Sequence, residues 1–200
     1  MASDKLANSP LARAQLARAA LRLGGRLVLM TDDERLKDPL AAARALPRGS
    51  LVIVRARHAR HRAELAAALM QIARARKLMV LIAGDGPLAL KVGAHGIHLS
   101  QVRARDAAHW RSRRPHWLIT VSAHSLAACA ASRHADAAVL APVFATASHP
   151  GRTPLGALRT RIAVRASPVP VYALGGIDAH SVARLAGAKL AGLAAVGALA

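Results

Sequence analysis

The sequence predicts a single α/β domain folded as a (β/α)8 barrel, and two patterns lead to this prediction. Short apolar runs alternate with helical patterns from residue 26 to the C-terminus. Several of these runs are continuously apolar, which is typical of parallel strands that are covered on both faces. An open doubly wound sheet is the alternative, but no G-x-G-x-x-G motif follows an early strand. The closed barrel therefore explains the pattern better.

The apolar runs number eight, which is the strand count of a TIM barrel. The predicted strands are Arg26–Thr31, Leu51–Arg55, Leu78–Ala83, Gly96–Leu99, Leu118–Ser122, Ala137–Ala141, Val169–Leu174 and Leu190–Ala195. The helical stretches between them include His61–Lys77, Ser125–His134 and Ala179–Ala186. With 200 residues, 54% of them hydrophobic, the chain is short for this fold but long enough to bury one core.

An amphipathic helix is predicted ahead of the barrel, in an N-terminal extension formed by residues 1–25. Ser9 is a good N-cap, Pro10 suits the first helical position, and a Gly-Gly pair ends the helix. An Arg-rich, acid-poor start is also typical of an organelle transit peptide, but the well-formed caps favour a helix that closes one end of the domain. The barrel then occupies residues 26–200. Only Gly197–Ala200 follow the last strand, so the final helix is expected to be truncated.

The chain carries 29 Lys and Arg residues against 10 Asp and Glu residues, a formal net charge of +19. This balance favours a phosphate-rich partner, either nucleic acid or a small phosphorylated substrate. Proteins that bind single strands stack bases on exposed aromatic side chains, and aromatic residues make up only 2% of this chain. The charges are also spread along the whole sequence. We therefore expect small phosphorylated ligands and no nucleic acid.

Membrane and redox signals are weak. No apolar run approaches the ~18 residues that a membrane-spanning helix needs, so we expect a soluble protein that does not contact a membrane. Cys129 is the single cysteine and cannot form an internal disulfide, which fits a reducing cytoplasm. Assembly into a homo-oligomer stays open.

Glycines follow the last two predicted strands. In a barrel of this kind the chemistry takes place at the carboxyl ends of the strands. Gly175 and Gly176 follow the seventh strand, and Gly197 follows the eighth. Glycine lets the backbone approach an anion closely, and a helix that begins there points its N–H groups at the anion. Because these two loops form the usual phosphate site of the fold, we expect a phosphate to bind here.

Polar side chains follow the fifth and sixth predicted strands. His124 comes directly after the fifth strand, where an imidazole can act as acid or base near neutral pH. A purely structural hydrogen-bonding role is the alternative for this histidine. Thr146, Ser148 and His149 lie in the long loop after the sixth strand and can donate hydrogen bonds to phosphate oxygens.

The segment Leu118–Ala198 resembles the thiamin phosphate synthase/TenI family, whose motifs there are V-S-x-H-S, G-P-V-F-x-T-x-T-K-P-G-x-x-P-L-G, I-G-G-I and V-S-A-I. The matching segments are Val121–Ser125, Ala141–Gly156, Leu174–Ile177 and Val196–Leu199. Upstream, Leu27–Asp32 is similar to the family's L-Y-L-V-T-D, and Val92–Gln101 is similar to its V-G-A-D-G-V-H-L-G-Q. The resemblance runs in the right order and agrees with the predicted barrel strand for strand.

The resemblance implies a barrel enzyme of thiamin biosynthesis. Thiamin phosphate synthases join hydroxymethylpyrimidine diphosphate to thiazole phosphate and release pyrophosphate with the help of Mg²⁺. TenI proteins tautomerise the thiazole phosphate, and the residue that matches their acid/base histidine is His124. The implied holders of the thiazole phosphate are the backbones of Gly175, Gly176 and Gly197. The residues implied to hold pyrophosphate or to frame the site are Ser122, Thr146, Ser148 and His149.

The basic residues expected near pyrophosphate are partly exchanged. The family's V-Q-L-R-E-K after the second strand becomes Val52–Arg57, which keeps the Arg as Arg55 and replaces the Lys by Arg57. The Lys of T-K-P is His149, and the Ser after the last strand is Gly197. A leaving diphosphate needs its developing charge neutralised, and the candidates for this catalytic work are Arg55 and Arg57.

The carboxylates expected to bind metal are absent from their positions. The Asp of the family's N-D-R aligns with Gly84, and the acidic residues after H-L-G-Q become Val102 and Arg103. Mg²⁺ prefers carboxylate oxygens. Asp85, one residue out of register, is the single carboxylate left as a candidate ligand. The family therefore implies Mg²⁺, while the residues themselves argue against a metal site.

Three functions follow from these observations. The first is a synthase in which the pyrimidine diphosphate ionises and the thiazole nitrogen then captures the resulting pyrimidine cation. The second is a TenI-like tautomerase in which His124 moves a proton without metal. The third is a barrel that binds a phosphorylated ligand without turnover.

Overall fold

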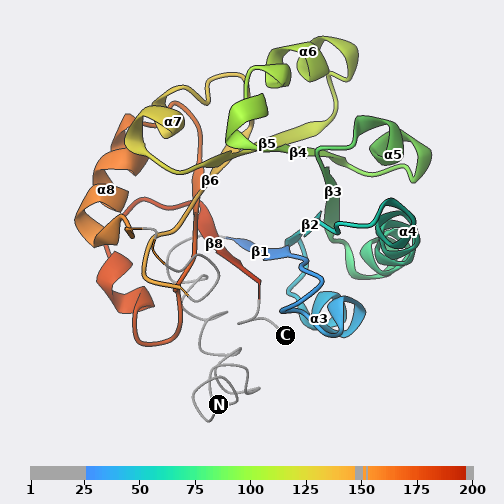
Figure 1. Ribbon diagram of the computed structural model, residues 1–200, viewed down its shortest axis with the longest axis horizontal. Coiled ribbons are helices and arrows are strands. Elements are labelled where there is room, and N and C mark those ends of the chain that lie inside the picture. The colour runs from blue at the N-terminus through green and yellow to red at the C-terminus, as the bar shows by residue number, and fades with distance from the viewer. Residues whose placement is uncertain (1–25, 147–150, 152, 197–200) are drawn as a thin grey trace.

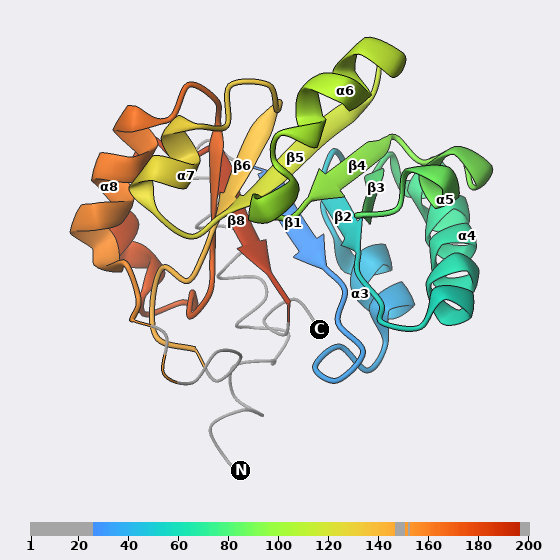
Figure 2. The ribbon, with the colours of Figure 1, turned by 45° about the horizontal axis from the view of Figure 1, so that its top comes forward.

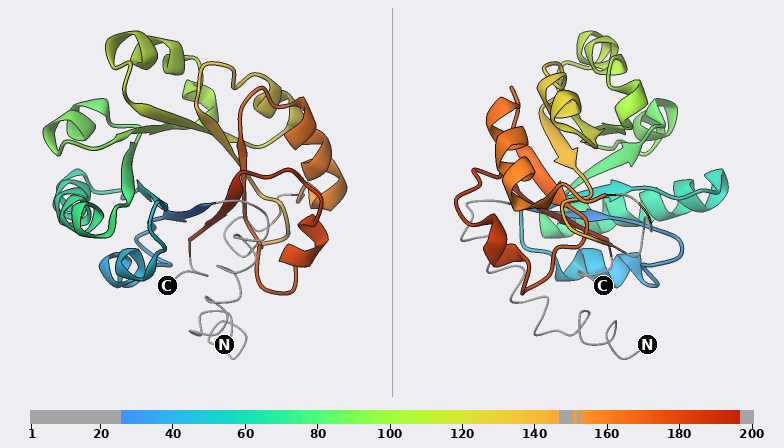
Figure 3. Two further views of the ribbon diagram at one scale, coloured as in Figure 1. Left: turned by 180° about the vertical axis from the view of Figure 1, so that it is seen from behind. Right: turned by 60° about the vertical axis from the view of Figure 1, so that its left-hand side comes forward.

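The computed structural model describes residues 26–146, 151 and 153–196. Within them the chain forms a closed barrel of parallel strands that pair in the order β1 to β8, and β8 pairs with β1. Helices surround the ring of strands (Figure 1), and the view from behind shows the same arrangement (Figure 3). The predicted (β/α)8 TIM barrel is confirmed.

Every predicted strand is present, with ends within two residues of the expected positions. The strands are β1 (Arg26–Met30), β2 (Leu51–Val54), β3 (Met79–Ala83), β4 (Gly96–Leu99), β5 (Leu118–Ala123), β6 (Ala137–Leu140), β7 (Val171–Leu174) and β8 (Gly192–Ala195). All neighbouring pairs are parallel, as Figure 2 shows for β8 and β1. The carboxyl ends of all strands consequently open at one end of the barrel.

The helices that follow the strands differ widely in length. They are α3 (Pro39–Ala45), α4 (Ala59–Arg76), α5 (Gly86–Lys91), α6 (Asp106–Arg113), α7 (Leu126–Ala130) and α8 (Gly156–Ala166), with the 3₁₀ helices η1 (Gln101–Arg103) and η2 (Val182–Leu185). Side chains cap three of them: the carboxylates of Asp38 and Asp85 accept from the first turns of α3 and α5, and the hydroxyl of Ser125 does so for α7.

Two predicted helices are shorter than expected. The helix predicted over Ser125–His134 ends at Ala130, and the hydroxyl of Ser132 donates to the carbonyl of Ala128 at 2.8 Å, a local bond that competes with further helical turns. The helix predicted over Ala179–Ala186 is only η2. Gly187 follows it with a φ of 78°, and this left-handed conformation ends the helical segment.

The alternation of side chains along each strand divides the core into two layers. One layer lies between the outer face of the barrel and the helices. The buried apolar residues of the interior layer are Val28, Met30, Leu51, Ile53, Leu81, Ala137, Val139, Tyr172 and Ala194. Cys129 packs in the outer layer, where burial raises the pKa of its thiol to about 11. A buried thiol with a raised pKa is a poor nucleophile, because the thiolate is the reactive form.

Several sequence predictions fall outside the described residues: the N-terminal helix in residues 1–25, Ser148, His149, Gly197 and the truncated last helix. No helix in the described part of the chain is long and apolar enough to cross a membrane. The aromatic side chains of Phe144 and Tyr172 are buried, and the rings of Trp110 and Trp117 stack on each other at 5.3 Å.

Candidate active site at the carboxyl ends of the strands

The barrel places the predicted site residues of different strands at one rim. Arg55 follows β2, His124 follows β5, and Gly175 follows β7 directly. Ser122 lies near the end of β5, half-buried. Because all strands are parallel, their carboxyl ends meet at the same end of the barrel. Residues that are far apart in the sequence therefore come together at its mouth.

A buried histidine lies near this end, on β4. The side chain of His98 on β4 is 5% exposed, and its Nδ1 and Nε2 atoms lie 2.8 Å from Thr120 Oγ1 and 2.9 Å from Ser122 Oγ. Burial, and then the positive charge of Arg55, lower the pKa of His98 to about 4. The imidazole is therefore neutral near pH 7, donating to one hydroxyl and accepting from the other.

His98 was not among the predicted site residues. Two signals could have found it: it matches the histidine of the family's V-G-A-D-G-V-H-L-G-Q motif, and its interior position on β4 alternates with the outward-facing Ile97 and Leu99. The strand register then sets His98 opposite Thr120. Polar groups are costly to bury unless they are hydrogen-bonded. The polar pair His98 and Thr120 inside an apolar barrel therefore indicates a role in function or in specifying the fold.

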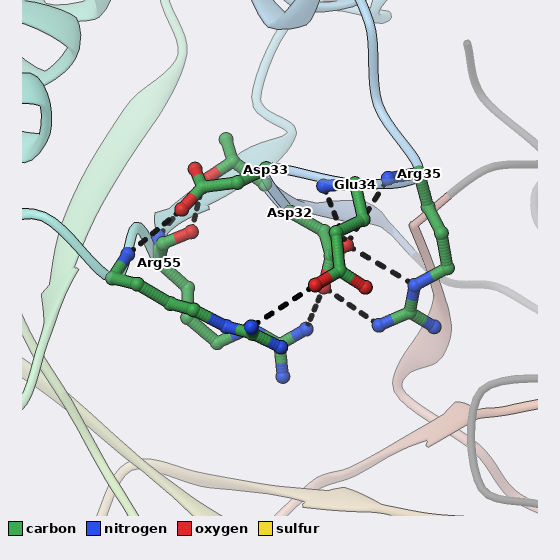
Figure 4. A network of polar contacts seen from close by, with 7 residues as sticks. Asp32, Asp33, Glu34, Arg35 and Arg55 are labelled. Carbon is green, nitrogen blue, oxygen red and sulfur yellow. Dashed lines mark hydrogen bonds and ion pairs between the residues drawn. The ribbon is translucent and has the colours of Figure 1, made fainter.

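Arg55 is held at the mouth by β1 and the loop that follows it. The hydroxyl of the buried Thr31 accepts from the backbone N–H of Arg55 at 2.8 Å and donates to its carbonyl at 3.1 Å. The Arg55 guanidinium forms an ion pair with Asp32, which lies between Arg55 and Arg35 in Figure 4. Burial alone would raise the pKa of Asp32, but the hydrogen bonds and charges of these arginines outweigh it and hold the pKa well below its usual range. Asp32 is consequently ionised and orients Arg55.

Arg57 lies farther out than Arg55. Its backbone N–H donates to the carboxylate of Asp33 at 2.8 Å, and its guanidinium pairs with Glu34 at 3.0 Å. The side chain of Arg57 is 79% exposed. The structure thus brings both predicted arginines to the same rim but leaves Arg57 in solvent, where an ion pair is weak and easily exchanged for another anion.

His124 is fixed by two hydrogen bonds. Its backbone N–H donates to Gln101 Oε1 at 2.7 Å, and its Nδ1 atom lies 2.7 Å from the carbonyl oxygen of Ala141. A carbonyl oxygen can only accept, so Nδ1 carries a proton. In the neutral ring this leaves Nε2 as a free base on an exposed side chain. The arrangement suits proton transfer at Nε2.

The two glycines after β7 lie against the loop after β6. A Cβ atom added to Gly176 would lie 2.3 Å from the carbonyl oxygen of Ala145, and one added to Gly175 would lie 3.0 Å from Pro142. Both glycines also have positive φ values, of 95° for Gly175 and 64° for Gly176. Backbone packing and the left-handed conformation therefore already require glycine here. Thr146, the next candidate in the loop after β6, is half-buried.

The short η2 replaces the helix that was expected to point its N–H groups at a phosphate. The carboxylate of Asp178 accepts from the N–H groups of His180 and Ser181, at 2.9 and 2.7 Å. Burial raises the pKa of Asp178, but these hydrogen bonds outweigh it and lower the pKa overall. The donors ahead of η2 are thus occupied by the protein's own carboxylate. A phosphate at this loop would depend on the backbone of the glycine turn, without a helix dipole.

The residues at the β3 and β4 ends do not fit a magnesium site. Among residues 26–146, 151 and 153–196, no three His, Cys, Asp or Glu side chains form a group that could hold a metal ion. The Oδ1 atom of Asp85 accepts from Leu88 N at 2.9 Å, and its Oδ2 atom lies 3.8 Å from Arg62 Nη1. Both carboxylate oxygens of the candidate ligand are therefore engaged, one as a helix cap and one with an arginine.

Comparison with known proteins gives consistent similarities. A family model described as thiamine monophosphate synthase matches residues 27–199. The thiamine-phosphate synthase of Herpetosiphon aurantiacus is 31% identical over 189 residues, which is 90% of each chain. A putative thiamine-phosphate synthase 2 of Aquifex aeolicus is 34% identical over 116 residues, 57% of this chain and 62% of that protein. The thiamine-phosphate synthase of Synechococcus is 34% identical over 87% of this chain but only 52% of its own length.

Among solved structures, a thiamine phosphate pyrophosphorylase from Pyrococcus furiosus is similar, with a TM-score of 0.69 and 23% identity over 88% of this chain and 87% of that one. An HpcH/HpaI aldolase from Desulfitobacterium hafniense reaches a TM-score of 0.59 at 12% identity, over 90% of this chain and 89% of that one. At these identities both structures support the barrel fold alone.

Proposed function

The chain belongs to the thiamine monophosphate synthase family, and on that premise we propose that it is a synthase of thiamin biosynthesis. It would join hydroxymethylpyrimidine diphosphate to thiazole phosphate. The observation that carries the proposal is that the same rim of the barrel holds Arg55, which is bonded to Thr31 and Asp32, and Ser122, which is hydrogen-bonded to the buried His98. The mouth of the barrel therefore offers a cation that can bind a diphosphate and a hydroxyl group whose direction is fixed.

The reaction requires the bond between the pyrimidine methylene carbon and the diphosphate oxygen to break. The electron pair leaves with pyrophosphate, and the ring nitrogen of the thiazole phosphate then donates its lone pair to the methylene carbon. No proton has to move in these two steps. The protein's task is to stabilise the charge that develops on the leaving group, which preorganised cations achieve best.

Arg55 suits that task because it is preorganised from two sides. Its backbone is bonded to Thr31 and its side chain to Asp32, so little reorganisation is needed when a diphosphate arrives. Because His98 is neutral, it does not draw the anion away from Arg55. Its hydrogen bond fixes the direction of the Ser122 hydroxyl. Ser122 then offers a hydrogen bond to a substrate at the mouth.

A second function is favoured by the tautomer of His124. Nδ1 of His124 is bonded to the carbonyl oxygen of Ala141, so Nε2 is the basic nitrogen. A base of this kind is what a thiazole phosphate tautomerase of the TenI type needs, and such a reaction needs no metal. The two functions differ in whether His124 is essential, which makes them separable.

The purified protein is assayed for both reactions, thiamin phosphate formation and thiazole phosphate tautomerisation. Incubation with hydroxymethylpyrimidine diphosphate and thiazole phosphate should yield thiamin phosphate, and the Arg55→Gln variant should lose most of this activity. The tautomerase reaction is followed with the thiazole phosphate tautomer alone. The informative variant is His124→Gln, with His116→Gln as the matched control because His116 is an exposed histidine before β5, at the opposite end of the barrel.

Thiamin phosphate formation that survives His124→Gln supports the synthase. Metal-independent tautomerisation that disappears in His124→Gln but not in His116→Gln supports the second function. If the folded protein binds both ligands and converts neither of them, the synthase proposal is rejected, and a ligand-binding role without turnover remains.

A further inference from the structure

The loops that follow β3 and β4 are joined by an arginine. Arg103 Nη1 donates to the carbonyl oxygen of Gly84 at 3.0 Å, and Arg103 Nε donates to Asp106 Oδ2 at 2.8 Å. Gly84 is the residue directly after β3, and Arg103 ends η1 directly beyond β4. These are the two positions at which the family resemblance places metal-binding carboxylates. The structure therefore sets a fixed cation where the family implies a pair of anions.

The position of Arg103 is determined by bonds on both sides of η1. At the start of η1, Gln101 Oε1 accepts from the backbone N–H of His124 at the end of β5. At its end, Arg103 reaches back to the β3 end. Only one η1 residue separates these two anchors, so the guanidinium has little freedom to move away from the rim.

The carboxylates at this rim are already engaged with side chains of the protein. The ion pairs are Asp32 with Arg35 and Arg55, Glu34 with Arg57, Asp85 with Arg62, and Asp106 with Arg103, and Asp33 Oδ1 lies 3.8 Å from His61 Nε2. A divalent cation would have to displace arginines from several of them to gain ligands. Its charge would also be repelled by the guanidinium of Arg103.

The charge balance permits anion binding without a metal. Two carboxylates and one Mg²⁺ sum to zero, and Arg103 with its partner Asp106 also sums to zero. A guanidinium also presents several N–H donors in a plane that matches phosphate oxygens. Arg103 uses two of its N–H groups for Gly84 and Asp106. Its side chain is 48% exposed, so its remaining donors are open to a ligand.

A second guanidinium lies close to the same strand end. Arg55 directly follows β2 and Arg103 lies just beyond β4, and β2 and β4 are the two neighbours of β3 in the barrel. Arg55 and Arg103 are thus placed on the two sides of the β3 end. Two cations that flank one position are the arrangement that a diphosphate, with charges on both phosphoryl groups, requires.

We propose that Arg103 replaces the divalent cation in this chain, so that a diphosphate group binds at the barrel mouth through Arg103 and Arg55 without Mg²⁺. The inference rests on the proposed function, because it identifies the diphosphate as the group bound there. It goes beyond that function by stating how the anion is held, which is by a protein guanidinium in place of a metal ion.

The first experiment measures binding of inorganic pyrophosphate by isothermal titration calorimetry, in EDTA and in excess Mg²⁺. The wild-type protein should bind at least as tightly in EDTA as with Mg²⁺. Arg103→Met should weaken binding in EDTA by roughly ten- to a hundredfold, the usual effect of losing one charge-assisted hydrogen bond. Arg105→Met is the matched control, since Arg105 is an exposed arginine two residues along the chain, and it should change binding by less than about twofold.

The second experiment measures metal binding directly, by electron paramagnetic resonance of added Mn²⁺. The wild-type protein should bind no Mn²⁺ in the presence or absence of pyrophosphate. The double variant Gly84→Asp/Arg103→Asp restores the carboxylate pair and should bind Mn²⁺ and require metal for pyrophosphate binding. A side chain at position 84 meets no atom within 4 Å, and Asp tolerates its left-handed conformation better than most residues do.

The outcomes separate this inference from the proposed function. Pyrophosphate binding that requires metal in the wild-type protein, or that is unchanged in Arg103→Met, overturns the inference and leaves the synthase proposal standing. Failure to bind pyrophosphate under either condition, in protein shown to be folded, contradicts both. Tight binding in EDTA that is lost in Arg103→Met supports the inference, whatever the activity assay gives.

Discussion

The Nε2 atom of His98 lies 2.9 Å from the Oγ atom of Ser122, in the interior of the barrel directly below its mouth. The other ring nitrogen is bonded to Thr120. A neutral imidazole held between two hydroxyls orders both of them, because each hydroxyl must match the donor or acceptor character of the nitrogen it faces. This contact connects the stability of the barrel to the geometry of the site.

The buried His98 makes stability depend on pH. Its pKa is about 4 in the folded protein against an ordinary value of 6.5, so between these values the unfolded chain binds a proton that the folded protein does not. Stability is then lost as the pH falls, by roughly 2 kcal/mol between pH 7 and pH 5. Urea unfolding at both pH values measures this. His98→Gln should remove most of the difference.

The His98→Gln variant is needed because the pH dependence of wild-type unfolding alone does not separate the contribution of His98 from those of other groups. Burial also lowers the pKa of His95, which therefore contributes to the pH dependence with the same sign. This contribution is shared by wild type and His98→Gln. An unfolding free energy that falls equally between pH 7 and pH 5 in both proteins would show that His98 is not the cause.

The His98–Ser122 bond should appear as a coupling in activity. If His98 orients the Ser122 hydroxyl, then His98→Gln and Ser122→Ala each lower kcat/KM, and the double variant loses less than the product of the two effects. We expect a coupling of roughly 1 kcal/mol, the usual contribution of one hydrogen bond. The control cycle pairs His98→Gln with Ser125→Ala, because the Ser125 hydroxyl caps α7 instead. Equal coupling in both cycles would contradict a positioning role.

We expect the hydroxyl of Thr31, and not the size of its side chain, to hold the backbone of Arg55 in place. Thr31→Val keeps the shape but leaves the N–H and carbonyl groups of Arg55 without their bonds to Thr31 Oγ1. We expect a loss of about 1–3 kcal/mol in the free energy of unfolding, together with weaker pyrophosphate binding. Thr31→Ser keeps both hydrogen bonds and should lose less than about 1 kcal/mol. Denaturant titration and calorimetry measure the two effects, and equal losses in the two variants would count against this account.

Gly176 and Gly187 form a matched pair for testing the glycine turn. Both have positive φ, but a Cβ atom on Gly176 would meet the Ala145 carbonyl at 2.3 Å, while one on Gly187 would meet nothing within 4 Å. Gly187→Ala should cost about 1–2 kcal/mol for the left-handed conformation alone. Gly176→Ala should cost a further 1–3 kcal/mol or so for the overlap. Equal unfolding free energies of the two variants would mean that the loop after β6 yields readily.

The strands were predictable because each one is a short apolar run, and the parallel barrel buries both faces of such runs. The rim positions of Arg55 and His124 followed from the same pattern, since residues after parallel strands share one edge. Helix lengths were less predictable. The end of α7 and the start of η2 depend on Ser132 and Asp178, whose side chains bond locally in ways that composition does not reveal.

The roles of individual side chains required the folded structure. Neither the interior period of His98 nor its place in a matched motif revealed its hydrogen bond to Ser122, which is 24 residues away in the sequence. Gly175 and Gly176 suggested a phosphate site in the sequence, whereas the structure adds the close approach of the loop after β6 as a reason for glycine. Asp85 stood out as a lone carboxylate, and its engagement as the cap of α5 depends on how that helix begins.

The sequence by itself determined the barrel, the order of its strands and the residues that reach its mouth, because these depend on patterns of a few residues that local sterics and apolar burial enforce. Only the tertiary structure decided which charges meet. The bond between Arg103 and Gly84 joins residues 19 positions apart, and the pairing of Asp32 with Arg55 joins residues 23 apart. Such contacts depend on strand register and barrel closure, and electrostatic interactions follow distance in space, not separation along the chain.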